Sequence, residues 1–117
     1  MNIINRNNRL IGEITDNNVI IQHEDDILDL IGNCKYQAVE RLIIHESQLH
    51  PSFFDLKTKI AGNILQKFST YQMKIAIIGD FSKFESKSLA DFIFESNKQG
   101  QVYFLNSTND AIDCLAK

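Results

Sequence analysis

The chain has 117 residues, of which 44% are hydrophobic, 23% are charged and one is proline. This composition is typical of one packed domain over residues 1–117, and it excludes a disordered chain. The formal net charge is -3 and the 12 basic residues are scattered, so we expect no nucleic-acid partner.

No apolar run approaches the length of about 18 residues that a membrane-spanning helix needs, and no signal-peptide pattern is present. We therefore expect no membrane span and a cytoplasmic location.

Short β-branched or apolar clusters open the chain. They cover Asn2 to Arg6, Leu10 to Ile14 and Val19 to Gln22. The polar breaks between them, Asn7-Asn8 and Asp16-Asn17-Asn18, suit tight turns, because Asn and Asp tolerate left-handed backbone. The pattern predicts an antiparallel meander.

Helical spacing begins at the next acidic cluster. Apolar residues recur on one helical face from Ile27 to Cys34, and Asp25 and Asp26 stand where the helix dipole favours negative charge. The spacing predicts a first helix that ends near Tyr36.

The two cysteines show no metal-binding or redox spacing. Cys34 and Cys114 are far apart, without a CxxC or Cys/His pattern, and both fall on predicted core faces. We expect two buried, reduced thiols rather than a zinc site or a disulfide.

A strand followed by a helix comes next. Glu40 to His45 is a short apolar strand, and Ser52 with Asp55 three residues later predicts a capping box. Apolar residues then recur at helical intervals from Phe53 to Phe68, which predicts the longest helix of the chain. The unbroken apolar run from Lys74 to Ile78 predicts a strand covered on both faces and central in the sheet.

The C-terminal part repeats this pattern. Ser86 predicts the cap of a third helix and Gly100 its left-handed end. Val102 to Leu105 predicts the last strand, and Ser107 with Asp110 predicts a capping box before a short terminal helix. Right-handed crossovers make the later strands parallel neighbours. The expected fold class is α/β, with one mixed β-sheet, an N-terminal antiparallel meander, parallel β-α-β units and about four helices.

Two long segments of the sequence resemble a known family. FFDLKTKIAGNILQKFSTY followed by KIAIIGDFSKFESKSLADFIFESNKQG is similar to the bacterial family called domain of unknown function 4180. More distantly, the word DLK, a helix and an apolar strand closing on GD resemble the SpoIIAA-like branch of STAS domains. The resemblance implies a STAS-like fold in a bacterial protein, and it implies no reaction, because the closer family has no established activity.

STAS antagonists of anti-sigma factors carry a Ser or Thr phospho-acceptor near the start of their second helix. By this resemblance the corresponding region is His50 to Asp55, where Phe54 or Asp55 occupies the acceptor position and Ser52 is offset. The departure counts against a phospho-switch and leaves the expected fold unchanged.

Ligands in open α/β sheets bind beyond the carboxyl ends of the parallel strands. Four residues near those ends, His45, Glu46, His50 and Asp80, are suitable metal ligands. No helical ligand pair is present among them, so solvated loop residues are the favoured interpretation. We expect no metal and no cofactor.

The loop after the predicted strand near residue 76 has two interpretations. Asp80 braces the loop by accepting backbone N–H bonds, or it lines a pocket that Gly79 allows a ligand to approach closely. Serines and lysines at the start of the third helix could hold an anion, but no nucleotide-binding glycine pattern is present. Caps and solvated lysines are the favoured interpretation of that group, which comprises Ser82, Lys83, Ser86, Lys87 and Ser88.

Phe53 and Phe54 are adjacent aromatic residues. On a helix they point in directions about 100° apart, so both cannot enter one core stripe. Either one ring lies on a surface used by a partner, or the loop over residues 46–51 covers it.

These observations lead to three hypotheses. The first is a non-catalytic, STAS-like regulatory or interaction module that contacts a protein partner through the strand ends and the two phenylalanines. The second is a small-ligand binder with a pocket between the loops after His45 and Gly79. The third is an enzyme that uses His45 or His50 with Asp80. The candidate binding residues are His45, Glu46, Phe53, Phe54, Lys57, Gly79, Asp80, Ser82 and Ser86. A homodimer through an exposed helix or edge strand fits each hypothesis.

Overall fold

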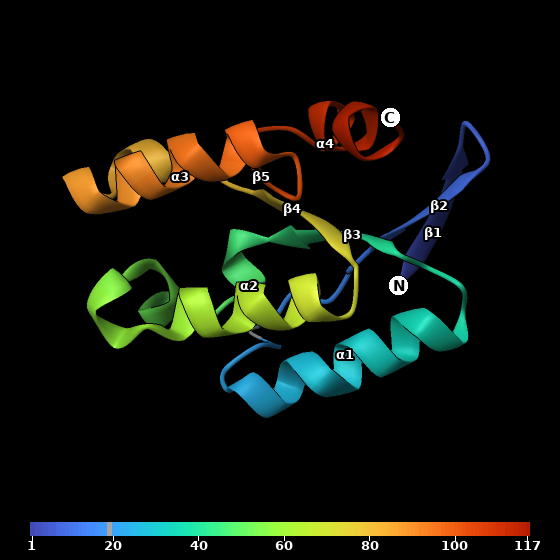
Figure 1. Cartoon of the computed structure of the whole chain (residues 1–117), viewed down its shortest axis with the longest axis horizontal. Coiled ribbons are helices and arrows are strands. Elements are labelled where there is room, and N and C mark those ends of the chain that lie inside the picture. Colours follow the sequence, from blue (N-terminus) through green and yellow to red (C-terminus); the bar gives the residue numbers. More distant parts are fainter. Residues whose placement is uncertain (19) are drawn as a thin grey trace.

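A five-stranded mixed sheet forms the centre of the molecule (Figure 1). The computed structural model describes residues 1–18 and 20–117. The strands lie in the order β1-β2-β3-β4-β5; β1 is antiparallel to β2, and all other neighbours are parallel. Their bounds are β1 (Asn2–Arg6), β2 (Arg9–Glu13), β3 (Arg41–His45), β4 (Lys74–Ile78) and β5 (Val102–Leu105).

The described ranges also contain four α-helices and four short 3-10 turns; all lie between strands except the last helix, which follows β5. The helices are α1 (Glu24–Tyr36), α2 (Ile60–Thr70), α3 (Lys87–Gln99) and α4 (Thr108–Leu115). The 3-10 turns are η1 (Glu46–Gln48), η2 (Pro51–Phe54), η3 (Leu56–Thr58) and η4 (Phe81–Lys83). The α/β class, the mixed sheet and the parallel β-α-β units are confirmed.

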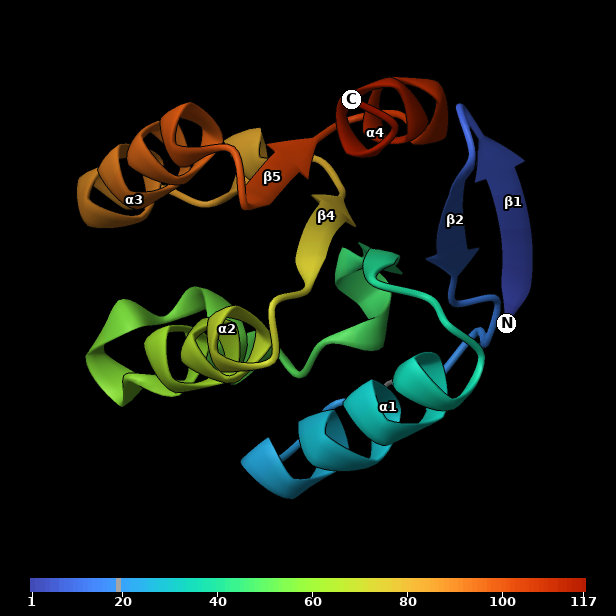
Figure 2. The ribbon, with the colours of Figure 1, turned by 45° about the vertical axis from the view of Figure 1, so that its right-hand side comes forward.

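Helices cover both faces of the sheet, with separate clusters of buried side chains (Figure 2). On one face α1, α2 and α3 pack on alternate residues of β3 and β4, including Leu42 and Ile75. On the other face α4 packs on the intervening residues, including Ile43 and Ala76. The predicted burial of the fourth strand on both faces is confirmed. It lies inside the sheet between β3 and β5.

The N-terminal meander is confirmed as a hairpin of two strands. Asn7 and Asn8 have φ of 56° and 64°, which is the left-handed pair that a two-residue hairpin turn requires. The third predicted strand, from Val19 to Gln22, is wrong as far as the structure describes it. Val19 lies outside the described residues, and Ile21 forms only an isolated parallel bridge with Leu49. β2 pairs in parallel with β3 instead, because α1 provides the crossover connection between them.

The long helix predicted from residue 53 is also wrong in its first part. Residues 51–58 form two 3-10 turns, and α2 begins only at Ile60 after Lys59, which has a φ of 63°. Asp55 caps the second of these turns by accepting from the N–H of Lys57 at 3.1 Å. The Thr58 hydroxyl accepts from the N–H of Ile60 at 3.2 Å. Side chains near the start of the expected helix thus bond locally to the backbone, which favours separate turns.

The caps of the two C-terminal helices are confirmed. The Ser86 hydroxyl accepts from the N–H of Leu89, and the Ser107 hydroxyl accepts from the N–H of Asp110, each at 3.1 Å. Gly100 ends α3 with a φ of 76°.

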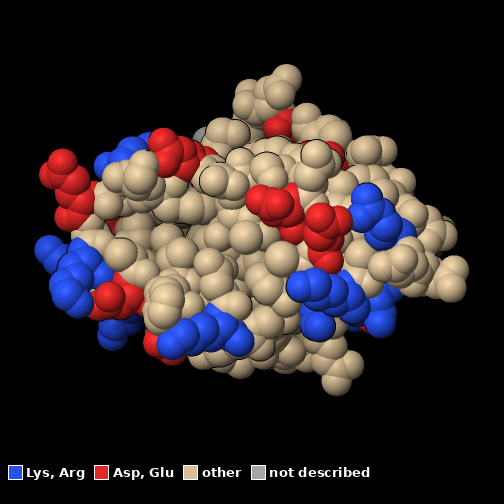
Figure 3. Space-filling model, turned by 90° about the horizontal axis from the view of Figure 1, so that it is seen from above, with Lys and Arg blue, Asp and Glu red and all other residues tan. Residues whose placement is uncertain are grey.

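Both cysteines are free thiols; Cys34 is buried and Cys114 is half-buried. No helix in the described ranges is long and apolar enough to cross a membrane. On the face seen in Figure 3, basic and acidic side chains are interspersed and separated by uncharged surface.

Candidate functional site

The carboxyl ends of three parallel strands bring polar side chains together at the same end of the strands, which is called the carboxyl edge of the sheet here. Glu13 ends β2 and His45 ends β3, while Gly79 and Asp80 directly follow β4. The turn η1 follows His45 without a break and places Glu46 above the end of β4. The predicted edge is therefore the place where these residues meet.

His45 pairs with a residue that the sequence did not single out. Its Nε2 lies 2.8 Å from Oε2 of Glu13, and both side chains are partly buried. His50 bonds through Nδ1 to the hydroxyl of Ser52 at 2.8 Å. Among the described residues no hydrogen bond joins either histidine to Asp80. The direct contact between a histidine and Asp80 that the enzyme hypothesis could use is therefore not observed, and Asp80 is bonded within its own turn.

Asp80 braces the loop after β4. Its Oδ1 accepts from the N–H of Ser82 at 3.1 Å and from the Ser82 hydroxyl at 2.5 Å. These bonds lower the pKa of Asp80 below its usual range, and the bond from the Ser82 hydroxyl has a larger effect than the bond from the backbone N–H. The bracing interpretation of Asp80 is confirmed. Asp80 also lines, with Gly79 and Ser82, a second, open cavity of about 370 Å³, so its role as a pocket residue stays a prediction.

Glu46 lies directly on Gly79. A Cβ added to Gly79 would stand 2.7 Å from Cγ and 2.8 Å from Cδ of Glu46. Oε1 of Glu46 accepts from the N–H of Asp80 at 3.3 Å and from Nζ of Lys83 at 2.8 Å. The group that approaches Gly79 closely is thus the side chain of Glu46, whereas the approach of a ligand or a neighbouring backbone stays a prediction.

A buried glutamine holds η1 in position. Gln48 is 2% exposed; its Nε2 donates to the C=O of Ile14 at 2.9 Å and to the C=O of Asp16 at 2.7 Å. Its Oε1 accepts from the N–H of His45 at 2.9 Å. Buried polar groups that are fully paired rigidify their surroundings. Gln48 therefore fixes the turn that carries Glu46, and apart from its place after a strand no sequence pattern indicated this role.

Both phenylalanines are buried, at 2% for Phe53 and 7% for Phe54. The expectation of an exposed ring is wrong. The alternative that the loop over residues 46–51 covers the second ring stays a prediction, because the rings packed on Phe54 from the segment after β4 are those of Phe81 and Phe84. The ring of Phe54 stacks on Phe84, with centroids 4.8 Å apart and an interplanar angle of 17°. Adjacent side chains of the 3-10 turn over residues 51–54 point about 120° apart. Both rings are buried because Phe54 packs against Phe53 and against Phe81 and Phe84 from the segment after β4.

A cleft opens between the segment after β3 and the segment after β4. Its volume is about 320 Å³, and its lining residues are Glu46, Ser47, Leu49, Pro51, Phe54, Lys83 and Phe84. Rings and aliphatic side chains form most of this lining, and the Glu46–Lys83 ion pair supplies the charged groups. The sequence predicted a pocket between these two loops but missed Phe84, whose role depends on the stack with Phe54.

The other candidate residues lie outside the cleft lining. Ser82 and Ser86 act within turns and caps, and the backbone N–H of Lys57 is held by Asp55. Two lysines of the anion hypothesis are paired, Lys83 with Glu46 and Lys87 with Asp91, each at 2.8 Å. In the part of the chain that the structure describes, no three His, Cys, Asp or Glu side chains are grouped closely enough to hold a metal ion.

Comparison with known proteins identifies the family. The family model described as Domain of unknown function (DUF4180) matches residues 6–115, so the chain belongs to this family. The comparisons found no significantly similar curated protein and no significantly similar solved structure.

Proposed function

For a member of a family without an assigned activity, we propose from the geometry that the chain binds a small, mainly apolar molecule in the cleft between Glu46 and Phe84. The observation that carries this proposal is the cavity of about 320 Å³ at the carboxyl edge of the sheet. Its size falls at the lower end of ligand pockets, and its apolar lining with few polar groups is typical of them. Its position beyond parallel strands is the usual ligand position in α/β proteins.

The ion pair at the cleft suggests the polar end of the ligand. Lys83 donates one hydrogen bond to Glu46, and an ammonium group has three donors. The side chain of Lys83 is 55% exposed, whereas that of Glu46 is 18% exposed. An anionic group on the ligand would therefore meet the accessible lysine, while the apolar part packs on Phe54 and Phe84. A small apolar acid is the ligand class that fits these features best.

The test uses 1-naphthoate as the probe and neutral 1-naphthalenemethanol as its counterpart, followed by amide NMR shifts. We expect both to shift residues 46–54 and 81–84, with naphthoate binding more tightly. Lys83→Gln should remove that preference, since the cation is lost, while Lys87→Gln on α3 should retain it. A Ser47→Phe variant, which fills the cleft, should weaken both probes. Shifts spread over the whole surface, or an unchanged preference in Lys83→Gln, would refute the proposal.

The interaction-module hypothesis stays a prediction. Its proposed aromatic anchor is not available, because Phe53 and Phe54 are buried, so a protein partner would have to use other residues. The STAS-like relationship, the bacterial origin and the cytoplasmic location likewise stay predictions that rest on resemblance and sequence pattern.

A further inference from the structure

The two edges of the sheet differ in how they are protected. At the β5 edge, Oδ1 of Asn97 accepts from the N–H of Phe104 at 2.7 Å, and Nδ2 of Asn97 donates to the C=O of Phe104 at 3.3 Å. This amide occupies the position that a neighbouring strand would take. At the opposite edge, no strand or helix of residues 1–18 or 20–117 lies beyond β1 (Figure 2).

The open backbone groups of β1 can be identified from its register. A two-residue turn makes Arg6 and Arg9 a hydrogen-bonded pair. The pattern alternates, so the N–H and C=O groups of Ile3 and Asn5 point away from β2. Over residues 1–18 and 20–117, no protein group forms a hydrogen bond with these outward groups. Natural edge strands are usually protected by Pro, charged side chains or a bulge. β1 has no Pro or bulge, and its one charged residue, Arg6, lies at its end and pairs with Asp113 of α4 at 2.8 Å.

We propose that β1 is a dimerisation strand, which pairs antiparallel with β1 of a second copy of the chain and joins two five-stranded sheets into one. The outward groups favour one register. When Ile4 of one copy lies opposite Ile4 of the other, Ile3 of each copy faces Asn5 of the other copy. Each such pair exchanges two N–H···O=C bonds. The two-fold axis makes the surface self-complementary, which is the usual symmetry of homodimers.

Charge and apolar surface support a second copy as the occupant. Arg6 is the one charged residue of β1, and in this register it faces the uncharged Asn2, so no like charges oppose each other. Met1 and Ile3 are 40% and 39% exposed, and Tyr36 at the end of α1 is 91% exposed. Pairing would partly cover Met1 and Ile3, which are exposed apolar side chains beside an open strand.

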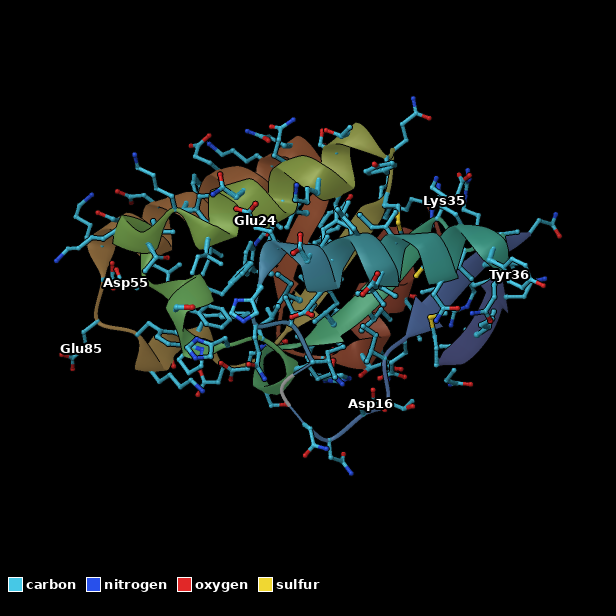
Figure 4. The ribbon with its side chains drawn as sticks, turned by 90° about the horizontal axis from the view of Figure 1, so that it is seen from below. Asp16, Glu24, Lys35, Tyr36, Asp55 and Glu85 are labelled. Atoms are coloured by element: carbon cyan, nitrogen blue, oxygen red, sulfur yellow. The ribbon has the colours of Figure 1, made fainter. Side chains whose placement is uncertain are left out.

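The dimer would leave the cleft open. Figure 4 shows Tyr36 at the end of the molecule that carries the hairpin. Asp55 and Glu85, which follow the cleft residues Phe54 and Phe84 in sequence, lie at the opposite end. The dimerisation and the ligand site are therefore independent, and either can fail without the other.

The first test removes one hydrogen bond without changing the hairpin. Asn5→Pro deletes an N–H that points outward, and Asn5→Ala is the matched control that keeps it. We expect the parent and Asn5→Ala to sediment as dimers, and Asn5→Pro to show at least a tenfold weaker dimer with the same far-UV circular dichroism. A parent that stays monomeric at concentrations of about 100 µM, or an Asn5→Pro variant that remains equally dimeric, would overturn the proposal.

The second test reads the register and does not depend on a proline. Ile4→Cys places two thiols at a non-hydrogen-bonded pair, where Cα atoms are about 4.5 Å apart and a disulfide can form. In Asn5→Cys the same two thiols are displaced along the strands and are too far apart. We expect rapid oxidative cross-linking only for Ile4→Cys. The parent chain measures the background cross-linking that comes from Cys34 and Cys114. Equal rates in both variants would overturn the register and the proposal.

Discussion

At the scale of single residues, Gly79 controls where the carboxylate of the cleft lies. The space that a Cβ would need is occupied by Cγ and Cδ of Glu46 at 2.7 Å and 2.8 Å. Gly79→Ala therefore displaces Glu46 from the N–H of Asp80 and from Lys83. We expect a loss of about 1–3 kcal/mol in the free energy of unfolding and weaker naphthoate binding, measured by urea denaturation and NMR titration.

Gly32 provides the control for that substitution. It lies in α1 with no atom within 4 Å of an added Cβ, so Gly32→Ala should stabilise the protein by up to about 1 kcal/mol through helix propensity. If both alanines changed stability and binding alike, the contact between Gly79 and Glu46 would have no role in positioning the cleft.

Cys34 makes stability depend on pH in the alkaline range. Burial raises the pKa of this thiol from 9.0 to about 11, so the folded state retains a proton that the unfolded state loses. Its contribution is complete below pH 9 and decreases as the pH rises toward 11, by about 3 kcal/mol in total. Denaturation curves from pH 8 to 11 should show a shallower decline for Cys34→Ala than for Cys114→Ala. Parallel declines would contradict this assignment.

Sequence reasoning identified strand-end residues correctly but not their partners. His45 and Asp80 could be chosen because strand ends are predictable from hydrophobic runs. Glu13 could not be matched to His45, because the pair depends on β2 lying beside β3. The sequence predicted an antiparallel meander at that point, which places Glu13 differently.

At the scale of elements, local chemistry decided which predictions succeeded. Asn7-Asn8, Ser86 and Gly100 act through their own backbone neighbourhood, and each was predictable. The start of α2 could not be predicted, because the apolar spacing from Phe53 to Ile60 is compatible with successive 3-10 turns as well as with an α-helix. The decisive feature is the left-handed Lys59, which no sequence pattern indicates.

Lys59 is therefore a site for stabilisation. A side chain in the left-handed region costs about 1–2 kcal/mol, and glycine avoids that cost while adding freedom to the unfolded chain. We expect Lys59→Gly to raise the free energy of unfolding by up to about 1 kcal/mol, measured by thermal or urea denaturation. Lys57→Gly is the control, since Lys57 has a negative φ in η3, and it should be neutral or destabilising. Equal effects would show that Lys59 is not strained.

At the scale of the whole molecule, the two hydrophobic clusters share the strands β3 and β4. Leu42, Ile44 and Ile75 belong to one cluster, whereas Ile43 and Ala76 belong to the other. The sequence predicted this double burial for β4, from the unbroken apolar run over Lys74 to Ile78, but not for β3. It could not predict the aromatic lining of the cleft, because Phe54 and Phe84 meet only after two separate crossovers have brought their loops together.

Because both clusters share β3 and β4, we expect the chain to unfold as one unit. We expect this even though α4 is the one described helix that contributes to the cluster of Ile43 and Ala76. Leu115 in α4 is fully buried, so Leu115→Ala should lower the free energy of unfolding by about 2–5 kcal/mol. Far-UV circular dichroism and tyrosine fluorescence, with Tyr103 beside this cluster, should then report one common midpoint. Leu28→Ala is the matched control, because Leu28 is 40% exposed, and its effect should stay below about 1 kcal/mol. Because β3 and β4 contribute to both clusters, cooperative unfolding requires the two clusters to be lost together. If Leu115→Ala separated the circular dichroism and fluorescence signals into different transitions, α4 would unfold independently of the rest.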